Sequence, residues 1–219
     1  VFPSASFEGE AIKVSLSLPS AQETEASYSY ITNAGEASAN DDYNEASGTI
    51  TFAPGETEKT IFIKTIDDDI KESGEFFNLI ISNSETGDQV SQIYIRDNDT
   101  VNISVLNNSA QEGAGSGLVE FNLSNSASMD VKAEYEVSQR ASGRIISSGT
   151  VAFAPGATSA FIEIPIVDDK LDEDDEIFDV KIVSSNADYV DTSVASFTVY
   201  DNDITPTANV SSVSLIEQD

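Results

Sequence analysis

The chain repeats itself, and this feature constrains its fold more than any other. Residues 50–55 read Ile-Thr-Phe-Ala-Pro-Gly and recur 101 residues later as Val-Ala-Phe-Ala-Pro-Gly at 151–156. Asp97-Asn98-Asp99 recurs 104 residues later, again as Asp-Asn-Asp, at 201–203. Self-similarity at a fixed period is typical of repeated structural units. A chain of 219 residues is long enough for two such units, each with its own core.

The repeat predicts how the chain is divided. We assign residues 1–100 to a first repeat and residues 101–205 to a second. Residues 206–219 are expected to begin a truncated third repeat, because Glu217 lies 105 residues after Glu112 and follows a strand-like stretch at 210–216. The small differences between the shifts indicate insertions in loops, which tolerate them. The chain is therefore expected to be an internal fragment of a longer array.

Each repeat is predicted to be all-β. Apolar and polar residues alternate in short stretches, as at Ile12, Val14 and Leu16, or at Ile162 and Ile164. This period of two is typical of strands with one buried face. The Pro-Gly pair that ends the repeated hexapeptide is a turn signal. About seven short strands per repeat favour two consecutive antiparallel immunoglobulin-like β-sandwiches. A single large barrel is the weaker alternative, since it leaves the repeat unexplained.

Composition excludes several classes of function. The chain has 39 acidic residues against 10 basic ones, and its formal net charge of −29 would repel nucleic acids and anionic membrane surfaces. It contains no Cys and no His, so disulfides, zinc sites and thiol or imidazole catalysis are not expected. No apolar stretch approaches the roughly 18 residues of a membrane span, so direct membrane insertion is not expected either.

The informative acidic residues stand at predicted strand ends, in the same order in both repeats. A Glu opens each repeat, an Asp run followed by two Glu lies in its middle, and Asp-Asn-Asp closes it. Loops from alternate strands meet at one end of a sandwich, so these groups are expected to converge there. The candidate metal ligands are Glu8, Asp67, Asp68, Asp69, Glu72, Glu75, Asp97 and Asp99 in the first repeat, and Glu112, Asp168, Asp169, Glu173, Glu176, Asp201 and Asp203 in the second.

Converging carboxylates need a counter-ion, because they would otherwise repel one another, protonate or move apart. Calcium takes about 6–8 oxygen ligands in flexible geometry, and a site without His or Cys favours such hard cations. One acidic run by itself is usually only solvated surface. That interpretation explains poorly why two repeats keep the same order of acids. The sequence therefore predicts Ca²⁺ as the cofactor.

The pattern Gly-Thr-Ile-Thr-Phe-Ala-Pro-Gly-Glu-Thr at 48–57, followed by Ile-Asp-Asp-Asp-Ile-Lys-Glu at 66–72 and Arg-Asp-Asn-Asp at 96–99, resembles the Calx-β family. The resemblance covers nearly the whole chain and is stronger in the first repeat. It implies a cluster of several calcium ions at one end of each sandwich. The ligands that it implies are the residues given above, except Asp69.

The chain also departs from the family pattern. The family usually has Asp-Gly-Thr-Ala ahead of the pair that matches Asp42-Tyr43, and its Asp falls here on Ala34. One ligand is then missing unless Glu36 replaces it. The second repeat lacks this segment altogether and has Lys170 where the first repeat has Asp69. We therefore expect fewer or weaker ions than in the best members of the family, above all in the second repeat.

The sequence leaves three hypotheses about function. The favoured one is a calcium-rigidified structural and adhesion module of a large extracellular surface protein, with calcium, adjacent repeats and cell-surface or matrix ligands as partners. The alternative is a calcium-sensing regulatory module in a cytoplasmic loop of a membrane transporter, which the resemblance implies. An enzyme, such as a glycosidase using Glu72 and Glu75, is not expected. Acids that recur in both repeats fit a repeated metal site better than one catalytic centre.

Overall fold

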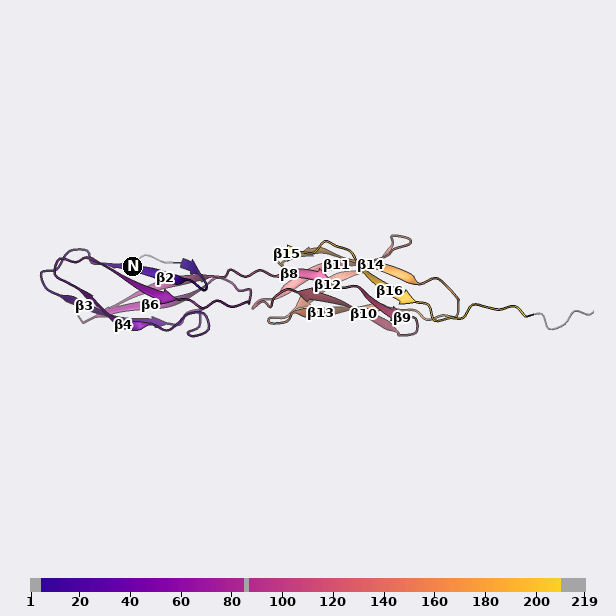
Figure 1. Cartoon of the computed structure of the whole chain (residues 1–219), viewed down its shortest axis with the longest axis horizontal. Helices are drawn as coiled ribbons and strands as arrows, with labels where there is room; N and C mark the ends of the chain where they lie inside the picture. Colours follow the sequence, from indigo (N-terminus) through magenta and orange to yellow (C-terminus); the bar gives the residue numbers. More distant parts are fainter. Residues whose placement is uncertain (1–4, 85–86, 210–219) are drawn as a thin grey trace, which may run out of the picture. The chain divides into compact units, whose positions relative to one another are not determined.

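The computed structural model describes residues 5–84 and 87–209. The chain folds into two compact units (Figure 1). The first comprises Val1–Val101 together with Asn125–Asp130, and the second comprises Asn102–Ser124 and Val131–Asp219. The expected strand at 210–216 and Glu217 lie outside the described residues. Within the described residues, no helix has the length and apolar character needed to cross a bilayer.

The first unit is a sandwich of two sheets. Five strands in the order β1-β7-β6-β3-β4 form one sheet, and β2 pairs with β5 in the other. The alternating pattern predicted for residues 12–16 is seen directly, since Ile12, Val14 and Leu16 are buried and their neighbours are exposed. The strands are β1 (Ala5–Phe7), β2 (Ala11–Ser17), β3 (Ala26–Asn33), β4 (Ser47–Phe52), β5 (Glu58–Lys64), β6 (Glu75–Asn83) and β7 (Gly87–Arg96).

The core of this unit extends to the strand ends that carry the acidic loops. Tyr43 is fully buried, and its ring stacks on that of Phe77 with centroids 4.1 Å apart. Phe77 lies near the start of β6, just after Glu72 and Glu75. The Tyr43 ring thus fixes the loop that contains Asp42 against the beginning of β6, because a buried aromatic pair is dense and directional.

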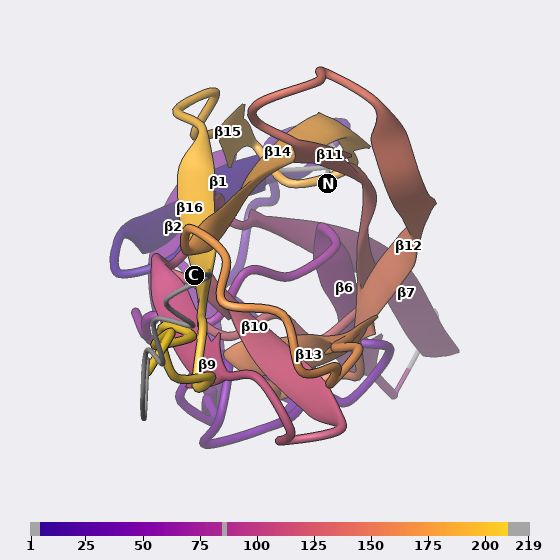
Figure 2. The same ribbon diagram turned by 90° about the vertical axis from the view of Figure 1, so that its right-hand side faces the viewer.

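The second unit has the same layered design (Figure 2). One sheet has the order β13-β10-β8-β15, and the other β12-β11-β14-β16-β9. Apolar side chains of the two sheets, including Phe121, Phe153 and Phe197, meet in the core. The strands are β8 (Asn102–Val105), β9 (Asn108–Gln111), β10 (Ser116–Leu123), β11 (Val131–Gln139), β12 (Ile145–Phe153), β13 (Ser159–Pro165), β14 (Glu176–Ser185), β15 (Tyr189–Val190) and β16 (Ala195–Tyr200).

The predicted all-β, immunoglobulin-like fold class is confirmed, with one difference in strand pairing. Most pairs are antiparallel, but β1 pairs with β7, β9 with β16, and β15 with β8 in parallel. The first two pairs have a common cause. After β1 and β9 the chain turns at Glu8-Gly9 or Glu112-Gly113 and enters the opposite sheet, so each opening strand adds to the edge of one sheet before its continuation joins the other.

Candidate metal centres

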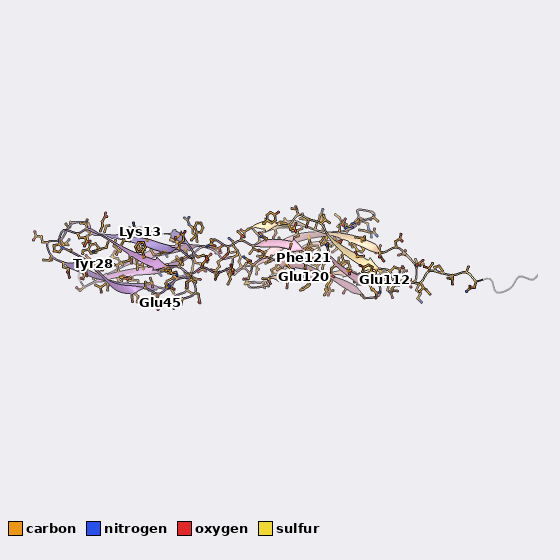
Figure 3. The ribbon with its side chains drawn as sticks, viewed as in Figure 1. Lys13, Tyr28, Glu45, Glu112, Glu120 and Phe121 are labelled. Carbon is orange, nitrogen blue, oxygen red and sulfur yellow. The ribbon has the colours of Figure 1, made fainter. Side chains whose placement is uncertain are left out.

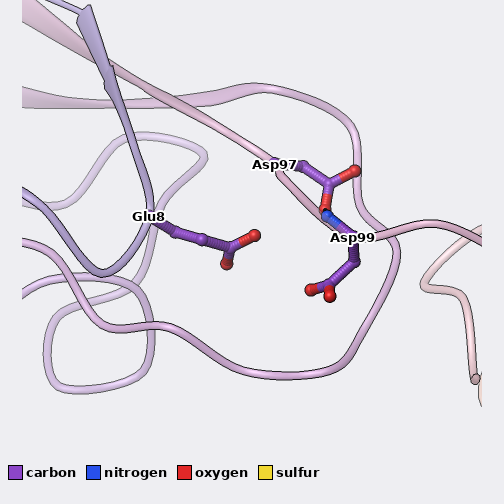
Figure 4. A group of neighbouring side chains, drawn as sticks. All are labelled: Glu8, Asp97 and Asp99. Carbon is purple, nitrogen blue, oxygen red and sulfur yellow. The ribbon is translucent and has the colours of Figure 1, made fainter.

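The first acidic cluster joins the beginning and the end of the first repeat. Glu8 follows β1, and Asp97 and Asp99 follow β7, the strand with which β1 pairs. One carboxylate oxygen of each residue lies within 4.8 Å of the others. Figure 4 shows the Glu8 carboxylate directed toward that of Asp99. Parallel pairing of β1 with β7 therefore brings together groups that are about 90 residues apart in sequence.

A glycine allows the Asp67 loop to approach this cluster closely. Gly9 has a φ of 75°, which L side chains rarely adopt, and a Cβ on it would lie 3.0 Å from the Cβ of Asp67. Gly113 has a φ of 81°, and its Cβ would lie 3.1 Å from Oδ1 of Asp168. The repeated Glu-Gly pair thus supplies a ligand and also a backbone position that leaves room for the next acid.

Hydrogen bonds fix the backbone of this cluster. Asn98 N donates to Glu8 Oε1 at 2.9 Å, and Asp99 N donates to Asp97 Oδ1 at 2.9 Å. Asn98 Nδ2 also donates to Asp67 Oδ1 at 3.0 Å. The middle Asn of the Asp-Asn-Asp triplet is therefore a structural link between the closing loop and the Asp run, because its amide can donate where a carboxylate could not.

The electrostatic environment of the first cluster disfavours ionised carboxylates. Burial, with repulsion from Asp99 and Asp97, raises the pKa of Glu8 to about 7. Burial and the charge of Asp97 also raise the pKa of Asp99 above its usual range. Oδ2 of Asp99 is buried and has no hydrogen-bond partner among the residues that the structure describes. A buried charged oxygen without a partner is costly, and a cation would satisfy it.

A second cluster lies in the same repeat and consists of Asp42, Glu72 and Glu75. Their nearest carboxylate oxygens lie within 4.8 Å of one another. Burial raises the pKa of Glu72 and of Glu75 to about 7, with further contributions from their acidic neighbours. Glu8 and Asp97 line the same small cavity as these three residues. The two clusters are therefore adjacent parts of one acidic site.

The Asp run lies beside these clusters and is partly used in shaping its own loop. Asp67 accepts the hydrogen bond from Asn98, and Asp68 Oδ1 accepts one from Ile70 N at 2.7 Å. The negative charges of Asp67, Asp68 and Asp69 all contribute to the raised pKa of Asp99. The structure therefore places the run next to the first cluster, with Asp68 stabilising the loop through a local turn.

The second repeat brings together Glu112, Asp201 and Asp203, again within 4.8 Å. Figure 3 marks Glu112 just before β10. Asn202 Nδ2 donates to Glu112 O at 2.7 Å and to Asp168 Oδ1 at 3.3 Å, as Asn98 does in the first repeat for Asp67. Burial raises the pKa of Asp203, whose Oδ2 has no hydrogen-bond partner in the described part of the chain.

The remaining predicted ligands of the second repeat are arranged differently. Glu176 accepts a hydrogen bond from Gln139 Nε2 at 2.8 Å, and Asp169 Oδ1 accepts one from Leu171 N at 2.7 Å. Glu173 contributes its backbone N–H to Asp201, at 3.1 Å. In the residues that the structure describes, Glu173 and Glu176 belong to no group of three converging carboxylates. The described partner of Glu176 is thus the neutral amide of Gln139, whereas Glu75 in the first repeat converges with the carboxylates of Asp42 and Glu72.

Asp42 is a site residue that the sequence analysis did not include among the candidate ligands. It could have been found from its position directly before the buried Tyr43, in the pair that matches the family pattern. Glu36, considered as a substitute ligand, is near enough for its charge to raise the pKa of Glu75. It is not among the three residues that converge.

The donor set fits calcium. All convergent groups offer oxygen, Glu8 is buried and the others are half-buried, and each repeat leaves a carboxylate oxygen buried without a protein donor among the described residues. Ca²⁺ accepts many carboxylate oxygens at once, whereas zinc and copper prefer nitrogen or sulfur ligands. A bound divalent ion would replace the repulsion within each cluster by attraction. Glu8, Asp97 and Asp99 would hold one ion, Asp42, Glu72 and Glu75 another, and Glu112, Asp201 and Asp203 a third.

We expect the chelated protein to become more stable as the pH falls from about 8 to about 5. Glu8, Glu72 and Glu75 have folded-state pKa values of about 7, above their ordinary value of 4.5. The folded state therefore binds more protons than the unfolded state between these values, so its stability rises as they protonate. Thermal unfolding in excess chelator at several pH values measures this. The triple Glu→Gln variant at these positions serves as the control and should show a flatter profile. A melting temperature that falls steadily with pH in the wild type would contradict the prediction.

Comparisons with known proteins identify the family to which this chain is similar. The sequence model of the Calx-beta domain matches residues 6–107 and 145–203. Sodium/calcium exchanger 1 of Rattus norvegicus is 43% identical over 70 residues, which are 32% of this chain and 7% of the exchanger. Sodium/calcium exchanger 2 of Homo sapiens is 46% identical over 59 residues, which are 27% of this chain and 6% of that protein.

Among solved structures, the calcium binding domain CBD12 of CALX1.1 is 23% identical, with a TM-score of 0.40, and the alignment covers 84% of this chain and 76% of that one. The chain spans only a small part of the exchangers that it matches. The family match, in contrast, covers more than half of the chain and includes both Asp-Asn-Asp triplets. The chain belongs to the Calx-beta domain family.

Proposed function

We propose that this chain is a calcium-binding module in which divalent ions neutralise the acidic end of each sandwich. The observation that carries the proposal is the first cluster, where three carboxylates converge within 4.8 Å and Asp99 Oδ2 is buried without a hydrogen-bond partner among the described residues. The same arrangement at Glu112, Asp201 and Asp203 supports it independently. Metal-free protein would then contain a repulsion that calcium removes.

The two repeats would bind calcium unequally. The first repeat has two adjacent clusters that line one cavity, whereas the described part of the second has a single group of three. Glu176 has the neutral amide of Gln139 as its described partner, whereas Glu75 has the carboxyl groups of Asp42 and Glu72 beside it. Since calcium affinity increases with the number of charged ligands, the first repeat would hold more ions and hold them more tightly.

For the wider role, we favour a calcium-responsive regulatory module of a membrane transporter, in a cytoplasmic loop. The curated proteins that the chain matches include sodium/calcium exchangers, with 43% identity over the 70 residues aligned to the rat protein, and this supports the regulatory hypothesis over the structural one. The calcium-rigidified adhesion module of an extracellular surface protein remains the second candidate. The repeat period, with its predicted third copy, favours that candidate. Transmembrane segments on either side of this region in the parent protein would decide for the regulatory module.

Calorimetric titration of calcium into chelator-stripped protein tests the proposed binding. We expect saturable binding with more than one ion per chain and a larger share in the first repeat. Asp42→Asn should remove ions from the first repeat, because Asp42 completes the group with Glu72 and Glu75. Asp41→Asn is the matched control. Asp41 precedes Asp42 directly and its side chain is exposed, so this variant removes the same charge from a residue outside the cluster. A titration without binding at millimolar calcium would overturn the proposal.

A further inference from the structure

A lysine side chain lies inside the first acidic site. Lys71 Nζ is 2.6 Å from Asp97 Oδ2, and it donates a hydrogen bond to the backbone oxygen of Asp99 at 2.8 Å. The Asp97 side chain is only 6% exposed, and that of Lys71 is 26% exposed. This ion pair is therefore largely removed from water, where charges interact more strongly than at an open surface.

The ammonium and a metal ion would compete for the same oxygen. Asp97 Oδ1 already accepts the hydrogen bond from Asp99 N, so Oδ2 is the oxygen available to a ligand from outside the loop. Lys71 holds that oxygen, while the neighbouring Asp99 Oδ2 has no hydrogen-bond partner within the described residues. An ammonium carries a single charge and three donors, so it neutralises the cluster only in part.

We propose that Lys71 is a tethered cation that occupies one ligand position of the first cluster in metal-free protein, and that calcium must displace its ammonium from Asp97 to bind there fully. This inference rests on the proposed calcium-binding function, and it assigns to Lys71 the role of setting the calcium concentration at which the first cluster fills. The lysine reduces repulsion when no metal is present and lowers the apparent calcium affinity, because part of the binding free energy is used to break the ion pair.

The second repeat has the opposite charge at this position. The loop Asp67-Asp68-Asp69-Ile70-Lys71 corresponds to Asp-Asp-Lys-Leu-Asp at 168–172, so Asp172 replaces Lys71. Asp172 accepts a hydrogen bond from Thr205 Oγ1 at 3.2 Å. Lys170, two positions earlier, contributes to lowering the pKa of Asp203 without outweighing burial. Each loop thus contains one lysine, but in the first the ammonium reaches the Asp that follows the last strand.

The test uses Lys71→Met in the full chain, since Met keeps the length of the apolar stem. We expect calcium affinity at the first cluster to rise about tenfold, the order of effect of removing one competing ion pair. In excess chelator the same variant should melt several degrees below the wild type, because Asp97 then lacks its partner. Lys59→Met is the matched control, because it breaks the 2.8 Å ion pair between Lys59 and Glu56. This pair lies at the start of β5, whereas the Asp run follows the end of that strand.

A direct readout separates displacement from a general charge effect. The ¹⁵Nζ and ¹³Cε resonances of Lys71, followed by NMR during a calcium titration, should change from those of a paired ammonium to those of a solvated one as the first cluster fills. As a reciprocal variant, Asp172→Lys should weaken calcium binding in the second repeat. Unchanged affinity in Lys71→Met, or a Lys71 resonance that stays unchanged at saturation, would overturn this inference while the wild type still binds calcium. If neither the wild type nor Lys71→Met bound calcium, the proposed function and this inference would be overturned together.

Discussion

Saturating calcium is expected to raise the melting temperature of this protein by roughly 10 °C or more relative to chelated protein. An ion that binds only the folded state at 100 times its Kd stabilises it by about 2.7 kcal/mol. For a domain of about 100 residues, which is the size of each repeat, each kcal/mol shifts the unfolding midpoint by about 4–8 °C. The effect should be large because a bound cation also offsets the burial and the mutual repulsion that raise the pKa of Glu8, Glu72 and Glu75 to about 7.

Differential scanning calorimetry with calcium, with chelator and with magnesium measures this effect. Magnesium should stabilise much less, since it needs near-ideal octahedral geometry and keeps its waters, whereas crowded carboxylates suit the larger ion. A sodium chloride control at matched ionic strength shows how much comes from screening of the net charge of −29. Superimposable melting curves in calcium and chelator would refute the calcium hypothesis.

Asp99→Asn is expected to have opposite effects on metal-free stability and on metal affinity. Burial and the charge of Asp97 raise the pKa of Asp99, so its ionised form is disfavoured in the folded protein. A neutral amide of the same shape should therefore make the chelated protein more stable. The same change removes a charged ligand, so calcium affinity at the first cluster should fall about 100-fold. Calorimetric titration and thermal unfolding of one variant measure both quantities.

Asp203→Asn provides the matched experiment in the second repeat, because Asp203 occupies the same place in its triplet and also has a buried Oδ2 without a partner in the described residues. It should weaken the second cluster and leave the first unchanged. Asp88→Asn is the control, since Asp88 lies in the β6–β7 hairpin, where Oδ1 accepts a hydrogen bond from Ser82. If Asp99→Asn lost stability in chelator and kept full calcium affinity, Asp99 would be a structural residue rather than a ligand.

These opposite signs follow from one physical relation between charge and stability. Buried carboxylates that repel each other cost free energy in the metal-free fold, and the same carboxylates increase the affinity for a divalent ion. A module built in this way changes stability steeply with calcium concentration. Lys71, paired with Asp97, would set the point at which the first repeat responds.

The sequence was a good guide to the local structure and to the order of the acids. Alternation at Ile12, Val14 and Leu16 predicted a half-buried strand, and those side chains are buried in β2. The repeated triplet predicted that Asp97 and Asp99 act with Glu8, and the structure brings these three together. Such features are readable because strand period and loop composition are local properties of the chain.

What the sequence alone determined was therefore the repeat, the all-β fold class and the acidic character of one end of each sandwich. Only the tertiary structure decided which acids share a site. It joined Asp42 to Glu72 and Glu75, paired Glu176 with Gln139, and placed the Lys71 ammonium on Asp97. The reason is that a carboxylate's role depends on its neighbours within a few ångströms, and these come from loops whose approach is set by strand pairing, by Gly9 and by the stacking of Tyr43 on Phe77.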